Sequence, residues 1–440
     1  MTTIAAIATP LGNAGVGIIR LSGTKSLGII SRCFDKSSLL VPRLAVTGQL
    51  VTPFFQDKII VIYFQGPNSF TGEDIIEIHA HGGFFALQKI LEHLYSLGAT
   101  PAQPGEFSRR AFLNGKLTLA CAEGLIELIH SESESQLAAS SIVARGKLAK
   151  KIKLMEDSLV QVSAQIEATL DYPEYDIEHT TKSQIKPLVK QCLDGIDSLL
   201  ATANQGRLIA NGISVAVLGK PNVGKSSLFN ALLDKDRSIV TDIAGTTTDT
   251  ISETILYKGV RIVLNDTAGL RHGSGKIERL GIERTKKIVE ECDVVLGIFD
   301  SSAPLDKEDN EILELCKRKK ALYVFNKSDI KKTPNKIDAL FVSALTGENV
   351  EQIKEEIYKL AVGSAQLLSN SIVITNARHL NELNLAKAHL STALTSLESQ
   401  SLDCVATDVM DALKALGNIS GTHATQAVID AVFSRFCLGK

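Results

Sequence analysis

The chain has 440 residues, of which 44% are hydrophobic and 22% are charged. At roughly 100–200 residues per domain, this length predicts two to four domains, and the composition excludes disordered and collagen-like chains. The 47 basic residues nearly balance the 49 acidic ones, and the formal net charge of −2 excludes a protein that coats nucleic acid through bulk charge.

The cysteines and the N-terminal residues exclude further classes of protein. Seven cysteines lie far apart without a Cys-x-x-Cys pair, so the sequence supports neither a zinc site nor a secreted disulfide framework. No basic segment precedes an apolar run near Met1, and no apolar stretch reaches the ~18 residues of a membrane span. We therefore expect a cytoplasmic protein with no membrane partner.

Residues 1–118 mix short apolar runs with glycine, proline and asparagine. Runs at Val16 to Leu21, Lys58 to Phe64 and Ile75 to Ile78 are typical of strands. Apolar residues at helical spacing predict a helix from Phe84 to Leu97. These elements predict an α+β N-terminal domain.

Residues 119–212 and 366–440 have helical periodicity. Apolar residues recur every three or four positions from Leu148 to Leu170, which predicts a long amphipathic helix, and a second helix is expected from Ile185 to Leu199. Because two helices cannot bury both apolar seams alone, we expect the C-terminal segment to complete a helical bundle.

Residues 213–365 alternate strands with helices, the pattern of a parallel sheet covered on both faces. The simplest arrangement inserts this α/β domain into the helical bundle, because insertion is tolerated where the chain ends of the host lie close together. The predicted fold class is therefore multidomain, with an α+β domain, an α-helical bundle and an inserted α/β domain.

A phosphate-binding loop with the sequence GKPNVGKS runs from Gly219 to Ser226, after an apolar strand and before a helix. This context is the one that a P-loop requires, whereas an isolated match could be a chance glycine-rich turn. Lys225 is expected to reach the β- and γ-phosphates of a bound nucleotide, and Ser226 to offer its hydroxyl to Mg²⁺. The residues predicted to bind nucleotide here are Asn222, Val223, Gly224, Lys225, Ser226 and Ser227.

A second motif, Asp266-Thr267-Ala268-Gly269, ends the next predicted strand. The aspartate can hold Mg²⁺ through water, and the glycine N–H can reach the γ-phosphate. Alone, this tetrapeptide is equally a strand-end turn, but its place after the P-loop makes it a nucleotide motif.

Two further segments predict the base specificity. Asp329, in Asn326-Lys327-Ser-Asp329, can accept hydrogen bonds from N1–H and the exocyclic amine of guanine, whereas adenine would leave the carboxylate without donors. This pattern favours GTP or GDP and opposes an ATPase or nucleoside kinase. The segment that completes the predicted base site is Ser343, Ala344 and Leu345.

The segment between these motifs resembles a nucleotide-dependent switch. Thr246 and Thr247 follow a glycine, and one such hydroxyl can join Mg²⁺ only when the γ-phosphate is present. Leu270 stands where Ras-like enzymes have the catalytic glutamine, so either hydrolysis is slow or another group positions the attacking water. Glu278 is one candidate, although by itself it could be a solvated carboxylate. The five elements in order predict an inserted Ras-like G domain.

With these motifs, the chain resembles the MnmE (TrmE) family of tRNA modification GTPases over essentially its whole length. The additional segments that carry the resemblance are Arg20 to Gly23, Ser69 to Asp74, His81 to Gly83, Pro104 to Lys116 and Cys437 to Lys440. The resemblance implies a homodimer whose N-terminal domain binds 5-formyl-tetrahydrofolate or a related folate and mediates dimerisation.

It also implies an FAD-dependent MnmG-type partner, which carries the FAD and forms a heterotetramer with the dimer. Together they would add a carboxymethylaminomethyl or aminomethyl group at C5 of the wobble uridine of tRNA. GTP hydrolysis, stimulated by K⁺, would drive a conformational change through pairing of the G domains.

The resemblance assigns roles to individual residues. Glu278 would be catalytic, and Thr241 would join the nucleotide-binding residues. Mg²⁺ would be held by Ser226 and Thr247, and K⁺ by Asn222, Thr241, Ile243 and Thr246. The folate would be bound by Arg20, Glu77, Lys116 and Lys440, and Cys437 would be a reactive thiol.

Several of these residues have simpler explanations that the sequence leaves open. Arg20 and Glu77 could form a surface ion pair, Lys440 could be a solvated terminus, and Cys437 could be an ordinary thiol. Thr248 stands where many members of the family have arginine, which leaves the switch contacts open.

Two broader alternatives also stay open. The basic run over 145–153 is either an RNA-binding patch or a solvated helix face. The function could instead be that of a GTP-switched RNA-binding or ribosome-assembly factor of the Era type, without modification activity.

Overall fold

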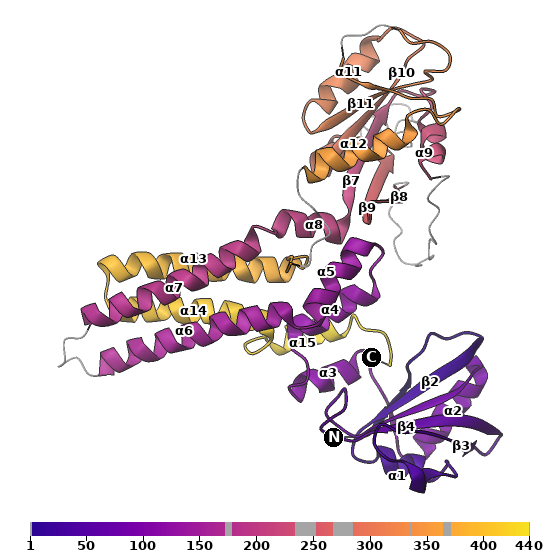
Figure 1. Ribbon diagram of the computed structural model, residues 1–440, viewed down its shortest axis with the longest axis vertical. Helices are drawn as coiled ribbons and strands as arrows, with labels where there is room; N and C mark the ends of the chain where they lie inside the picture. Colours follow the sequence, from indigo (N-terminus) through magenta and orange to yellow (C-terminus); the bar gives the residue numbers. More distant parts are fainter. Residues whose placement is uncertain are drawn as a thin grey trace, which may run out of the picture. The chain divides into compact units, whose positions relative to one another are not determined.

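The computed structural model of the chain describes residues 2–171, 178–233, 252–266, 285–333, 337–363 and 371–439. These residues form two compact units (Figure 1). The first unit comprises Met1–His130, Ser141–Ile196 and Asn381–Lys440, and the second comprises Ser131–Ser140 and Asp197–Leu380. The N-terminal sheet and most of the helical bundle thus share one unit, and the predicted domain limits at 118, 212 and 365 stay predictions.

A six-stranded sheet in the order β3-β4-β5-β2-β1-β6 forms the N-terminal part of the first unit. Neighbouring strands are antiparallel except for the parallel pair β1 and β6. The strands are β1 (Ile4–Ile7), β2 (Ala14–Ser22), β3 (Ala45–Val51), β4 (Gln56–Phe64), β5 (Ile75–Gly82) and β6 (Thr100–Pro101).

Alternation along β2 separates the two faces of this sheet. Ile19 and Leu21 are buried in the core with residues of α1 (Ser26–Ile30) and α2 (Phe84–Ser96), whereas Arg20 between them points to the other face and is half-buried. The predicted helix at 84–97 corresponds to α2. The strand β3 was not expected from the sequence, although its residues alternate between exposed and buried.

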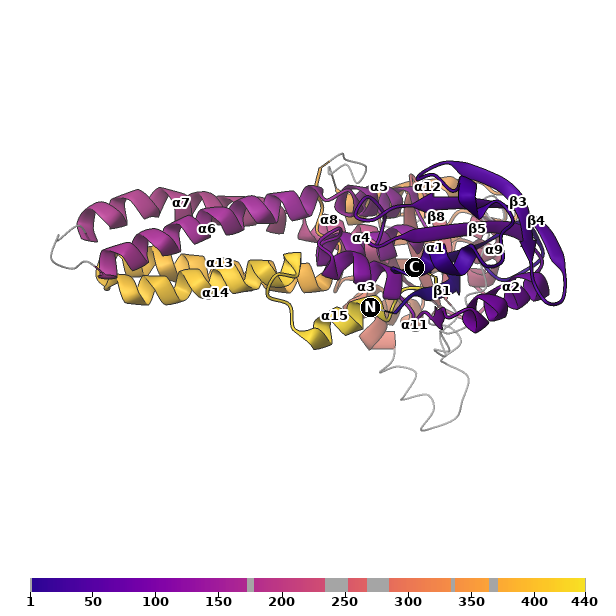
Figure 2. The ribbon, with the colours of Figure 1, turned by 90° about the horizontal axis from the view of Figure 1, so that it is seen from below.

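The helical part of the first unit is built around α6 (Lys147–Asp171) and α14 (Leu402–Ser420), which lie side by side with α7 (Glu178–Leu200) and α13 (Ala377–Ser399) (Figure 2). The predicted apolar seam is the buried face of α6. Helix α14, from the C-terminal segment, packs against α6, and its residues Val405, Val409 and Leu416 are also buried. The remaining helices before the second sheet are η1 (Ser37–Leu39), α3 (Glu106–Leu113), α4 (Leu119–Ile129), α5 (Glu134–Ala144) and α8 (Ala203–Asn211).

The C-terminal helix α15 (Gln426–Phe433) returns to the N-terminal half of the first unit. It packs on α3 and α4, and the rings of Phe112 and Phe433 lie 5.8 Å apart. Gly105, with φ +69, precedes α3, and a Cβ atom there would lie 2.2 Å from the Phe433 carbonyl oxygen. Beyond α15 the chain lies beside β1, because a Cβ atom at Gly439 would be 2.3 Å from the Ile7 carbonyl oxygen.

The second unit contains a sheet in the order β12-β11-β10-β7-β9-β8, in which only β8 and β9 are antiparallel. Its strands are β7 (Ile213–Gly219), β8 (Ser252–Tyr257), β9 (Val260–Asp266), β10 (Val294–Asp300), β11 (Ala321–Asn326) and β12 (Leu340–Phe341). Two apolar cores cover its faces, one with α9 (Lys225–Leu233) and α12 (Val350–Val362), the other with α11 (Lys307–Cys316) and a helix over 285–291.

Because β7, β9, β10, β11 and β12 are parallel to one another, their carboxyl ends meet at one edge of the sheet. The P-loop, Asp266 and the predicted base-binding segments all follow these ends. In the described ranges, no helix has both the length and the apolarity needed to cross a membrane.

Candidate functional site

The phosphate-binding loop connects β7 to α9. Asn222 and Gly224 have φ of 64° and 89°, so the backbone bends through the left-handed region at two positions. Lys225 is 7% exposed, and its ammonium donates to the carbonyl oxygens of Gly219 (2.9 Å) and Lys220 (2.5 Å). The lysine therefore closes the loop on itself with its charged end inside the loop.

Asn326, at the end of β11, joins this loop to the base-binding segment. Its Nδ2 donates to the Val223 carbonyl oxygen at 3.0 Å, and its Oδ1 accepts from the Ala344 N–H at 3.0 Å. Asn326 is 2% exposed. Gly224 is required beside it, because a Cβ atom at that position would lie 2.3 Å from Asn326 Nδ2.

Asp329 is exposed, and the buried Ser343 donates its hydroxyl to Oδ1 of this carboxylate at 2.6 Å. One hydrogen bond thus fixes the carboxylate that the sequence assigns to guanine recognition. Leu345, in the same base-binding segment, is 85% exposed. The structure brings together Asn326, Asp329, Ser343 and Ala344, as the motif order predicts.

Lys327 has φ 66° and donates to Asp300 Oδ2 at 2.5 Å. Burial raises the pKa of Asp300, but hydrogen bonds from Lys327 and Ser302 outweigh it, and the pKa lies below its ordinary value. The carboxylate therefore stays ionised at neutral pH and anchors the ammonium group of Lys327. Sequence analysis missed Asp300, whose only signal is its place at the carboxyl end of a strand.

A second ion pair outside the predicted set braces the P-loop. Lys220 Nζ lies 2.6 Å from Asp306 Oδ2 and 2.8 Å from Asp309 Oδ2. Asp306 and Asp309 form the capping box of α11. Burial lowers the pKa of Lys220, yet the two carboxylates raise it above the ordinary value. Lys220 is therefore held by α11 rather than turned toward a ligand.

Asp266 pairs with Val217 in the register of β9 and β7, which places it next to the strand that leads into the P-loop. Ser226 is exposed in the first turn of α9. Among the described residues, no group of three or more His, Cys, Asp or Glu is arranged to hold a metal ion. Predicted residues that lie outside the described ranges are Thr241, Ile243, Thr246, Thr247, Thr267, Ala268, Gly269, Glu278 and Lys440.

In the first unit, Arg20 and Glu77 face each other across β2 and β5. Arg20 donates to Glu77 Oε1 from Nε (3.0 Å) and Nη2 (2.7 Å), and its guanidinium lies 5.9 Å from the ring centre of Phe70 and 5.8 Å from that of Phe107. Arg20 Nη1 also lies 3.5 Å from the carbonyl oxygen of Gly439, next to the chain end.

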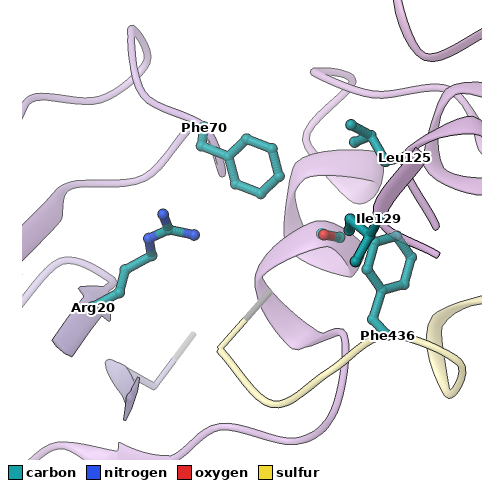
Figure 3. Close-up of a pocket in the computed structure, with 6 residues that line it drawn as sticks. Arg20, Phe70, Leu125, Ile129 and Phe436 are labelled. Atoms are coloured by element: carbon teal, nitrogen blue, oxygen red, sulfur yellow. The ribbon is translucent and has the colours of Figure 1, made fainter. Parts of the chain in front are cut away.

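Arg20 lines a hollow of about 220 Å³ (Figure 3). The other residues that line the hollow are Phe70, Ser108, Leu125, Ile129 and Phe436. We call this site the Arg20 hollow. It combines one cation with mostly apolar walls, a composition typical of small-molecule sites.

Sequence analysis named Arg20 and Glu77 but missed the aromatic walls of the hollow. Phe70 lies within the segment from Ser69 to Asp74 and Phe436 directly precedes Cys437, so both were next to named motifs. Lys116 lies beside this segment, because a Cβ atom at Gly72 would be 3.4 Å from Lys116 Cε. Cys437 is exposed.

Known proteins match the chain over its whole length. The tRNA modification GTPase MnmE of Natranaerobius thermophilus is 37% identical over 454 residues, which covers 100% of this chain and 99% of the relative. The protein of the same name from Lactobacillus gasseri is 38% identical and covers 100% of this chain and 98% of the relative.

Two solved structures of other GTP-binding proteins are similar to part of the chain. A variant of Aquifex aeolicus Era bound to GDP·AlF4⁻ is 28% identical, with 40% of this chain and 66% of that chain covered and a TM-score of 0.28. The G domain of the T. maritima FeoB iron transporter is 31% identical, with 34% and 98% covered and a TM-score of 0.26.

The fold and the nucleotide loops define a class, the multidomain P-loop GTPases. The family models for the N-terminus of the GTP-binding protein TrmE and for the MnmE helical domain match residues 3–116 and 119–437. With relatives at 37% identity that cover all of it, the chain belongs to the MnmE family of tRNA modification GTPases. The resemblance and the predicted fold class are thereby confirmed.

Proposed function

We propose that this GTPase acts in the cytoplasm as a homodimer, with an FAD-dependent MnmG-type partner, to modify C5 of the wobble uridine of tRNA. The group added would be carboxymethylaminomethyl or aminomethyl. The observation that carries the GTP-dependent part is Asn326, which bonds the P-loop and the base segment at once. A nucleotide that binds the P-loop and the base-binding segment would therefore contact both parts of one hydrogen-bonded unit.

The residues of the loops have separate tasks in GTP binding. Lys225 would exchange its contacts with the Gly219 and Lys220 carbonyl oxygens for the β- and γ-phosphates, which are stronger acceptors for an ammonium. Asp329, oriented by Ser343, would accept from the guanine edge. We propose that GTP hydrolysis then drives pairing and separation of two G domains.

Cations and a water-positioning group complete the proposed site. Ser226 and Thr247 would hold Mg²⁺, and the exposed hydroxyl of Ser226 at the start of α9 fits an oxygen ligand for this cation. The K⁺ ligands would be Asn222, Thr241, Ile243 and Thr246, of which Asn222 is exposed in the left-handed bend of the loop. A bound cation supplies positive charge beside the phosphate oxygens, and Glu278 would orient the attacking water.

We propose the Arg20 hollow as the folate site, with Arg20, Glu77, Lys116 and Lys440 as polar contacts. A folate combines a flat heteroaromatic ring with carboxylates, and the hollow offers aromatic walls next to a guanidinium. Arg20 could hold a polar ring edge or a carboxylate while Glu77 keeps the guanidinium in place. A reactive role for the exposed Cys437 stays a proposal without a contact that supports it.

The decisive experiment combines GTP turnover with nucleoside analysis of tRNA, with the FAD-dependent partner present and absent. Modified wobble uridine that needs the chain, the partner and GTP together would support the proposal. A deletion strain that keeps its normal wobble-uridine modification but has defective ribosomal subunits would favour the Era-type factor instead.

The ion and the catalytic carboxylate are tested by turnover alone. K⁺ should give faster hydrolysis than Na⁺, and Glu278→Ala should keep GTP binding but lose most hydrolysis. Glu290→Ala, which removes an exposed carboxylate from the helix over 285–291, is the matched control. Equal rates in both salts would discard the K⁺ site, and unchanged turnover of Glu278→Ala would remove this residue from the mechanism.

A further inference from the structure

A group of basic side chains surrounds the start of α6. Arg145, Lys147, Lys150 and Lys153 are exposed, and Lys151 is half-buried. We call these five residues the α6 basic cluster. Their charges lie within nine consecutive positions of a chain whose formal net charge is −2.

Three of these five side chains have no carboxylate partner in the part of the chain that the structure describes. Lys153 forms an ion pair with Asp157 at 2.9 Å, but Arg145, Lys147 and Lys150 have no carboxylate partner among the residues that the structure describes. Lys317, which is also exposed, does have such a partner, because its ammonium lies 2.6 Å from Glu314. Arg145, Lys147 and Lys150 therefore carry three positive charges that no ion pair offsets in the described part of the chain.

The position of the cluster opposes helix stability. The amino end of a helix carries partial positive charge and favours acidic residues, yet α6 has no acidic residue in its first turn. Lys147 also lies three and four positions from Lys150 and Lys151, where like charges repel each other. Leu148 and Ile152 are the buried positions of this turn, and any polar residue could occupy the exposed positions around them. Neither packing nor helix formation therefore accounts for lysine at these positions.

We propose that the α6 basic cluster binds the phosphate backbone of tRNA. This inference rests on the proposed function, which makes tRNA the substrate. Helix α6 rises about 1.5 Å per residue, so Lys147 and Lys153 lie about 9 Å apart along its axis. Phosphates of one strand follow each other at about 3.4 Å along a duplex, so the cluster spans two or three of them.

The chemistry favours an RNA backbone over a specific base. Lysine ammonium groups act as point charges toward phosphates and carry no sequence information. The cluster would therefore position the RNA and leave selection of the uridine to other parts of the assembly. A local basic patch of this kind also allows a chain with a formal net charge of −2 to bind RNA.

The test compares two variants of the full chain that lose the same charge. The first carries Arg145→Gln, Lys147→Gln and Lys150→Gln, and the control carries Lys25→Gln, Arg32→Gln and Lys36→Gln, three exposed cations in and around α1. Affinity for unmodified tRNA is measured over a series of salt concentrations. GTP turnover without RNA and the Tm are measured in parallel.

At low salt the cluster variant should bind tRNA roughly tenfold more weakly than the parent protein. A plot of log affinity against log salt concentration should also be less steep for the variant, with a slope smaller in magnitude by about 2 to 3. The control variant should have the same tRNA affinity and the same salt dependence as the parent protein. GTP turnover without RNA should stay the same in both, and the Tm of the cluster variant should be unchanged or higher because the helix loses repulsive charges.

Equal tRNA affinity of the two variants would overturn the proposal, as would a parent protein that fails to bind tRNA at low salt. Unchanged tRNA affinity with weaker binding of the FAD-dependent partner would also overturn it, and would assign the cluster to an acidic protein surface. Failure of the proposed function would look different, because the parent protein would then lack GTP turnover or GTP-dependent tRNA modification.

Discussion

In the second unit, residues that surround the P-loop come from the carboxyl ends of adjacent parallel strands, and Asn326 bonds two loops through their backbone groups. In the first unit, Arg20 is held by the side chain of Glu77 on a neighbouring antiparallel strand and is walled by aromatic rings from distant segments. Both sites contain a restrained cation. They differ in which part of the chain restrains it.

This difference determines how each site should respond to change. Backbone carbonyl and N–H groups hold Lys225 and Asn326, so a substitution there leaves buried polar groups without partners in the loops themselves. Side chains hold Arg20, and its loss should change the hollow without disturbing the sheet. The following predictions start with the largest expected effect.

Lys225→Ala should weaken GTP binding roughly 100-fold, because a hydrogen bond to a charged group contributes about 1.5–3 kcal/mol. Equilibrium titration with a fluorescent GTP analogue measures the loss. Lys220→Ala is the control within the same loop, because Lys220 is bound to Asp306 and Asp309 of α11 and should change affinity little. A similar loss for both variants would show that net charge, rather than position, governs binding.

Asn326→Ala should lower the free energy of unfolding by about 2–6 kcal/mol, since two buried hydrogen bonds are lost at about 1–3 kcal/mol each. GDP affinity should fall with it, because the P-loop and the base segment are no longer linked. Denaturant titration and GDP binding check the two effects. Asn310→Ala, which removes an exposed amide on α11, should change neither, and an unaltered Asn326→Ala protein would contradict the role of the link.

Arg20→Gln should weaken binding of 5-formyl-tetrahydrofolate roughly tenfold, the cost of about one charge-assisted hydrogen bond. GTP affinity should not change, because Arg20 belongs to the other unit. Calorimetric titration with the folate measures the effect, and Arg32→Gln supplies an exposed control. Full folate affinity in the Arg20 variant would remove the hollow from the proposal.

Thiol labelling at pH 8 should modify Cys404 and Cys437, which are exposed, and spare the five buried cysteines. Burial raises the pKa of the Cys33 thiol to about 11 and that of Cys316 to about 12, so both stay protonated at pH 8 and become thiolates only as pH rises toward these values. Mass spectrometry of labelled peptides measures the pattern. Rapid labelling of Cys33 or Cys316 in the folded protein would contradict the cores of the first and second units.

The nucleotide loops could be predicted because their signal is local. The spacing of Gly219, Gly224 and Lys225 follows from a backbone that must wrap a phosphate, and the parallel strands then bring separate motifs to one edge. Helix α6 was predicted for the same reason, since its buried seam repeats with the period of the helix. The sequence also identified Arg20 and Glu77, through resemblance to the family.

Sequence alone therefore determined the class of the protein, the order of its nucleotide motifs and the periodic faces of its long helices. Only the tertiary structure decided that Arg20 lies opposite Glu77, that Phe436 returns to wall the hollow, and that Lys220 is bound by α11. The physical reason is distance along the chain. Strand register and the return of the C-terminal segment are set by packing between residues far apart in sequence, whereas loops and helical periods are set by neighbours.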